Sequence, residues 1–101
     1  MNHKTIKDKT VLLVDDEKKV LFLLSDALNE KGFTVKTTTM PSEALEIVKS
    51  DSIDAVVLDL LMPQANGIQT LAAIKKIKPK IPVIILSGHG TIEKAVQALK
   101  T

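Results

Sequence analysis

Three short apolar segments of the chain end directly on carboxylate or hydroxyl side chains. Residues 55–58 lead to Asp59, residues 11–14 lead to Asp15 and Asp16, and residues 83–86 lead to Ser87. Apolar runs of this length are typical of strands that are buried on both faces of a parallel sheet. Ligands of such sheets bind beyond the carboxyl ends of the strands, so we expect these polar side chains to meet at one edge.

The carboxylates decide which chemistry this edge can support. Unit charges ~4 Å apart repel by about 4 kcal/mol at an effective dielectric constant of about 20, so a cation between Asp15, Asp16 and Asp59 is favoured. The chain has no cysteine, and a site made only of oxygen ligands suits Mg²⁺. A magnesium ion beside an Asp suits phosphoryl transfer, because Asp can accept a phosphoryl group covalently. The Ser87 hydroxyl could hydrogen-bond to a phosphoryl oxygen. Asp59 taken alone would more often end a strand or cap a helix, but three strand ends of this kind favour a site.

Apolar residues at helical spacing separate the predicted strands. They predict helices over 18–31, from 41 to about 48, over 68–77 and from 91 onward. Gly32 is predicted as a left-handed cap and Pro41 as a first-turn residue, whereas Pro63 and Gly67 predict a loop after Asp59. Residues 34–39 are β-branched and mostly polar, which indicates an exposed edge strand. Four strand-helix units predict an α/β fold with a doubly wound parallel sheet.

The composition fits one small globular domain. The chain has 101 residues, 45% of them hydrophobic, and a net charge of +2 with the charges dispersed. This balance predicts no binding of DNA or of a membrane by the chain itself, and no apolar run approaches the roughly 18 residues of a membrane span. Residues 1–9 are polar and predict a flexible lead-in without a signal peptide, so we expect a cytoplasmic protein. Four lysines, at 75, 76, 78 and 80, fit a solvated helix end better than a phosphate site.

Several segments together resemble the receiver domains of two-component response regulators. They are the pair Asp15 and Asp16, residues 57–63 (Val-Leu-Asp-Leu-Leu-Met-Pro) with Gly67, and residues 86–90 (Leu-Ser-Gly-His-Gly). The resemblance implies a flavodoxin-like fold in which Asp59 is the phosphoacceptor and Ser87 the switch hydroxyl. It implies a Mg²⁺ site built from Asp15, Asp16, Asp59 and the backbone carbonyl of Met62.

The resemblance also implies partners. A sensor histidine kinase would donate the phosphoryl group, and small phosphodonors could replace it. The turn at 87–90 is most similar to receivers of the nitrogen-regulator type, which precede an ATPase and a DNA-binding domain. DNA would then be contacted only through an output domain that is not in this chain, and the domain would be a signalling module rather than an enzyme.

The sequence departs from the family pattern at its C-terminal side. Family members continue into a fifth strand, which ends in a lysine that pairs with the phosphoryl group, and a fifth helix; no lysine up to Thr101 matches that position. We therefore expect a receiver domain over 10–101 that is incomplete at its C-terminus. An uncovered strand at 83–86 would favour a homodimer or higher association.

Two other functions are compatible with parts of the pattern. An aspartyl-phosphate phosphatase of the dehalogenase type would need a second acid two residues after the nucleophile, where this chain has Leu61. An interaction module that works without phosphorylation fits the missing lysine, but the acidic residues argue against it.

Overall fold

The structure is a computed structural model that describes residues 9–60 and 67–86. Strands and helices alternate along the chain. They are β1 (Thr10–Val14), α1 (Lys18–Glu30), β2 (Thr34–Thr38), α2 (Pro41–Ser50), β3 (Ala55–Asp59), α3 (Gly67–Ile77) and β4 (Val83–Leu86). The predicted order of elements is confirmed up to β4.

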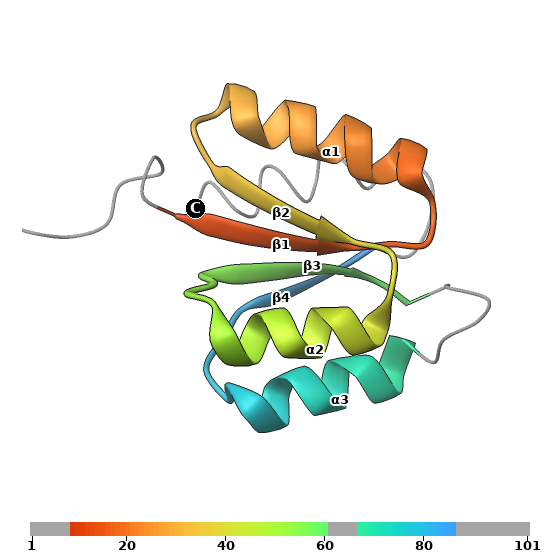
Figure 1. Cartoon of the computed structure of the whole chain (residues 1–101), viewed down its shortest axis with the longest axis vertical. Helices are drawn as coiled ribbons and strands as arrows, with labels where there is room; N and C mark the ends of the chain where they lie inside the picture. The colour runs from red at the N-terminus through yellow and green to blue at the C-terminus, as the bar shows by residue number, and fades with distance from the viewer. Residues whose placement is uncertain (1–8, 61–66, 87–101) are drawn as a thin grey trace, which may run out of the picture.

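The four strands form one parallel sheet in the order β2-β1-β3-β4. Helix α1 covers one face, and α2 and α3 cover the other (Figure 1). This is the flavodoxin-like doubly wound arrangement, in which the strand order reverses at β1 and β3. All strands point the same way, so their carboxyl ends, and the site predicted there, lie at one edge of the sheet.

Alternating side chains of the central strands build two cores. Leu12 and Val14 of β1 and Val56 and Leu58 of β3 pack with α2 and α3 on one face. Val11, Leu13 and Val57 pack with Leu21, Leu24 and Leu28 of α1 on the other. Burial on both faces explains why the central strands read as continuous apolar runs.

Glycine and proline lie at helix boundaries where the sequence predicts them. Gly32 has φ 96° after α1, which is the left-handed conformation that glycine adopts readily. Pro41 begins α2, where its missing N–H costs no helical hydrogen bond. Strand β2 lies at an edge of the sheet as predicted, and Lys36 in its middle forms an ion pair with Asp51.

Three expectations were wrong in detail. Strand β4 is not fully buried, because Val83, Ile84 and Ile85 are half-buried at the sheet edge of the described residues. Ile68 does not join the core face of α3, since it is 66% exposed. Gly67 does not lie in the loop before α3 but is the first residue of the helix.

Other predictions fall outside the described residues. They concern the lead-in before Lys9, Met62, Ser87 and the helix from Thr91. Association of copies through β4 also stays a prediction. No helix within 9–60 and 67–86 is long and apolar enough to cross a membrane.

Candidate functional site

The register of the sheet brings the acidic residues together. Val14 of β1 lies opposite Leu58 of β3, so the next residues along these two parallel strands, Asp15 and Asp59, are neighbours. Asp16 follows in the connection to α1. Residues that are 44 positions apart in the chain therefore share one edge because the two central strands are paired in this register.

The three carboxylates form a compact cluster. One oxygen from each of Asp15, Asp16 and Asp59 lies within 4.8 Å of the others. Asp15 is buried, Asp59 is half-buried and Asp16 is exposed, so the cluster runs from the protein interior to solvent. A ligand can therefore reach the cluster from the solvent side.

Asp15 is held in place at its backbone and its side chain. Its N–H donates to the Thr38 carbonyl of β2 at 3.2 Å, and its carboxylate oxygen Oδ1 accepts a hydrogen bond from the Glu17 N–H at 2.8 Å. The pKa of Asp15 is raised to about 6: burial is the largest cause, the hydrogen bond from the Glu17 N–H opposes it, and the negative charges of Asp59, Asp16 and Glu17 add to the rise. The hydrogen bond from Glu17 thus orients the carboxylate. Its buried surroundings destabilise the negative charge.

The donor set fits a magnesium ion. Mg²⁺ binds oxygen at about 2.0 to 2.1 Å, so opposite ligands of one ion lie about 4.2 Å apart. A separation of up to 4.8 Å can be closed by a small side-chain shift or by one water between carboxylate and ion, which Mg²⁺ commonly keeps. Positive charge at this position would also relieve the repulsion that raises the pKa of Asp15.

Two features of the site were not foreseen from the sequence. Thr38 was expected on an exposed edge strand, but it is buried, and its hydroxyl accepts the Met40 N–H at 3.1 Å while its carbonyl holds Asp15. No signal in a single sequence marks this burial. By contrast, the hydrogen bond from the Glu17 N–H to the Asp15 carboxylate could have been expected from the sequence, since Asp side chains often accept a hydrogen bond from the N–H two residues later.

The close packing of Gly67 on Leu60 is the second feature that was not foreseen from the sequence. A Cβ added at this residue would lie 2.5 Å from the Leu60 Cα and 2.8 Å from the Leu60 carbonyl oxygen. Leu60 directly follows Asp59, and its N–H donates to the Leu86 carbonyl of β4 at 3.4 Å. The absence of a side chain thus lets the start of α3 pack on the backbone beside Asp59.

The family model for the response regulator receiver domain matches residues 11–101. The chain belongs to this family. The receiver fold explains why the acidic residues of β1 and β3 lie at the carboxyl edge of a doubly wound sheet, which is the usual ligand position in such sheets. The roles of the individual site residues stay predictions.

The receiver domain is similar to part of two curated relatives. It is 44% identical over 92 residues to a protein named putative response regulator NtrX-like of Rickettsia conorii, covering 89% of this chain and 19% of the relative. It is 40% identical over 98 residues to the transcriptional regulatory protein GlrR of Escherichia coli, covering 97% of this chain and 21% of the relative. The chain thus spans about a fifth of the length of these relatives.

A solved structure links the same fold to a kinase. It is described as the histidine kinase ThkA in complex with the response regulator protein TrrA, and it matches the receiver domain with a TM-score of 0.74 and 34% identity. The match covers 81% of this chain and 71% of that chain. The sequence resemblance to response regulators is therefore confirmed at the level of the family and the fold.

The raised pKa of Asp15 makes a pH-dependent prediction for the metal-free protein. The folded-state pKa of about 6 lies above the ordinary value of 3.8, so the protonated group stabilises the fold fully below about pH 3.8 and this contribution is lost as the pH rises through about 6. In EDTA, Asp15→Asn should therefore be more stable than the wild type at pH 7.5, and the difference should shrink toward pH 4. Urea denaturation across this range measures it. If the stability difference between Asp15→Asn and the wild type did not change with pH, the negative charge of Asp15 would not destabilise the folded protein.

The contact between Gly67 and Leu60 predicts a linked loss of stability and site geometry. Gly67→Ala should destabilise the protein by about 1 to 3 kcal/mol, because the added methyl group has to displace backbone, and it should weaken magnesium binding by moving Asp59. The control is Gly32→Ala, which strains a positive φ after α1 at a cost of about 1 kcal/mol but lies outside the cluster. Urea denaturation and magnesium titration should separate the two variants. Equal magnesium affinity in both would contradict a positioning role for Gly67.

Proposed function

We propose that this receiver domain accepts a phosphoryl group on Asp59 from the phosphohistidine of a sensor kinase, in a reaction that requires Mg²⁺ at Asp15, Asp16 and Asp59. The observation that carries the proposal is the cluster of three carboxylate oxygens within 4.8 Å of one another in a chain that belongs to the receiver family. The solved complex of a related regulator with a histidine kinase supports the choice of phosphodonor.

The half-buried Asp59 can act as the nucleophile. Its carboxylate oxygen forms a bond to phosphorus while the phosphorus–nitrogen bond of the donor imidazole breaks, and the electron pair of that bond leaves with the nitrogen. When bound, Mg²⁺ neutralises charge on the phosphoryl oxygens. Asp15 contributes a carboxylate held by the Glu17 N–H, and Asp16 contributes one on the solvent side. The protein thus supplies position and charge rather than a general acid or base.

The remaining roles follow from the resemblance alone. The Met62 carbonyl would be a further metal ligand, and the Ser87 hydroxyl would bond to the phosphoryl group and report phosphorylation to the rest of the domain. The output would be transcriptional, as in the relatives named as transcriptional regulatory proteins, and would act through a domain outside this chain. The protein would be a signalling domain that is phosphorylated once per cycle.

Asp59→Asn should abolish phosphorylation, because the amide keeps the shape of the side chain but is not a nucleophile. With acetyl phosphate and Mg²⁺, mass spectrometry should show one phosphoryl group on the wild type and none on the variant. Asp26→Asn is the control, since Asp26 is exposed on α1, and it should be phosphorylated like the wild type.

Three other outcomes of that experiment would contradict the proposal. Undiminished phosphate on Asp59→Asn would place the acceptor elsewhere. Rapid turnover of acetyl phosphate without a stable adduct would indicate a phosphatase. No incorporation into the wild type would indicate an interaction module that has lost phosphorylation.

Magnesium should raise the midpoint of thermal unfolding of the wild type, because an ion that binds only the folded state stabilises it by mass action. Asp16→Ala should lose most of this rise, since one of the three carboxylates is removed. Asp26→Ala removes an exposed carboxylate outside the cluster and should keep the full rise. Equal magnesium shifts in the wild type and both variants would argue against the site.

A further inference from the structure

An apolar groove lies at the end of the sheet opposite to the carboxylate cluster. The groove has a volume of about 540 Å³. Its apolar walls come from the connections that lead into β3 and β4 and from the end of α3, and they consist of Ile53, Ile77, Pro79, Ile81 and Pro82. Ile53 and Ile81 form buried walls, while Pro79 and Pro82 are exposed. The groove thus offers apolar surface to solvent at a site with no part in the proposed phosphoryl chemistry.

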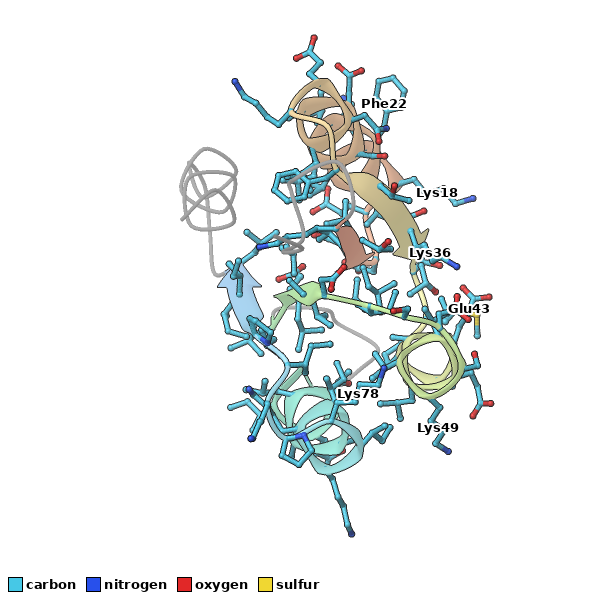
Figure 2. All side chains as sticks on the ribbon, turned by 90° about the vertical axis from the view of Figure 1, so that its left-hand side faces the viewer. Lys18, Phe22, Lys36, Glu43, Lys49 and Lys78 are labelled. Atoms are coloured by element: carbon cyan, nitrogen blue, oxygen red, sulfur yellow. The ribbon has the colours of Figure 1, made fainter. Side chains whose placement is uncertain are left out.

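The rim of the groove is basic. Lys78 and Lys80 line it, and residues 67–86 contain four lysines and no acidic residue. Figure 2 looks at this end of the molecule and shows Lys78 between α2 and α3. A carboxylate entering here therefore meets positive charge from the last turn of α3 and from the connection to β4.

The acidic residues nearest to the groove in the chain are already engaged. Asp54 lines the groove, and its carboxylate accepts the Thr10 N–H at 2.8 Å. Asp51 forms an ion pair with Lys36, and the Lys36 hydrogen bond lowers the pKa of its carboxyl. Its backbone carbonyl accepts a hydrogen bond from Lys78 at 3.2 Å. These contacts hold the two connections together and engage Lys78, while Lys80 is exposed to solvent.

The groove is built on a restrained backbone. Pro79 and Pro82 fix φ in the segment between α3 and β4, the Ile81 N–H donates to the Lys78 carbonyl at 3.1 Å, and the Lys75 ammonium donates to the Ile81 carbonyl at 2.5 Å. The Pro82 carbonyl accepts the Val56 N–H of β3 at 3.0 Å. A preformed wall reduces the ordering cost of binding.

A solvated helix end explains some of these lysines but not the groove. Lysines near a helix C-terminus are favoured by the helix dipole, which accounts for Lys75 and Lys76 at the end of α3. Lys80 follows Pro79, beyond the last turn of the helix, and it lines the groove together with apolar residues. Among the described residues, two lysines and one aspartate line the groove, and apolar surface with this excess of positive charge is complementary to a segment that carries apolar and acidic side chains together.

We propose that this groove is a docking site for an acidic, apolar segment of a partner protein. Apolar side chains of the segment occupy the space between Ile77, Ile81 and Pro82, and its carboxylates lie beside the exposed Lys80. The site is at the opposite end of the sheet from Asp59, so it engages the partner without covering the carboxylate cluster.

The test uses a fluorescein-labelled synthetic peptide of alternating leucine and glutamate pairs, with fluorescence anisotropy on the full chain. Lys80→Glu should weaken binding by about five- to tenfold, because one favourable exposed charge pair is replaced by a repulsive one. Lys49→Glu is the matched control, since Lys49 is 58% exposed on α2, pairs with Glu46 and does not line the groove. It should bind within about twofold of the wild type. A peptide with glutamine in place of glutamate should bind more weakly to the wild type, and added salt should weaken the glutamate peptide.

Amide chemical-shift mapping locates the peptide independently of affinity. The largest shifts should fall on residues 53–54 and 77–82, and acetyl phosphate should still phosphorylate Lys80→Glu.

Equal weakening by Lys80→Glu and Lys49→Glu, or shifts spread over other lysines, would reduce the effect to general charge attraction and overturn the proposal. Absence of peptide binding would overturn it too, as would binding to phosphatidylglycerol vesicles that displaces the peptide, since the surface would then be a membrane contact. Loss of phosphorylation on Asp59 would contradict the proposed function but not the docking site.

Discussion

Mutual repulsion among three carboxylates is the constraint on which the arrangement of this domain depends. Asp15, Asp16 and Asp59 hold oxygen atoms within 4.8 Å of one another, and Asp15 is buried, which raises its pKa. Such a cluster persists only if the backbone that carries it cannot relax. Strands β1 and β3 supply that rigidity, since Val11 to Val14 and Val56 to Leu58 are almost inaccessible to solvent. The apolar cores on the two faces of the sheet thus offset the local cost of the site.

The two ends of the strands carry different groups of charged residues. Asp15, Asp16 and Asp59 gather at the carboxyl edge, where α1, α2 and α3 begin and their dipoles favour negative charge. Lys75, Lys76, Lys78 and Lys80 lie at or beyond the end of α3, where positive charge is favoured. The two proposed sites therefore lie at opposite ends of the strands, the carboxylate cluster at one end and these lysines at the other.

Most of the fold could be predicted from local pattern. Apolar runs of four residues predicted β1, β3 and β4, helical spacing predicted α1 to α3, and Gly32 and Pro41 marked helix boundaries that the structure confirms. Two of the errors share one cause, which is that the burial of a side chain depends on its neighbours. Ile68 is apolar but points away from the sheet, and β4 is apolar but half-buried because it is an edge strand among the described residues.

The sequence by itself determined that the site consists of carboxylates at one edge of the sheet. A carboxylate that ends a buried strand has to lie at this edge, whichever strands are neighbours. Only the tertiary structure decided that Asp15 and Asp59 adjoin, since the pairing of β1 with β3 is a long-range register. It also decided that Thr38 anchors the Asp15 backbone and that Gly67 packs on Leu60. The first two of these contacts join residues far apart in the chain, and all three depend on how backbone segments pack, which side-chain type and spacing alone do not specify.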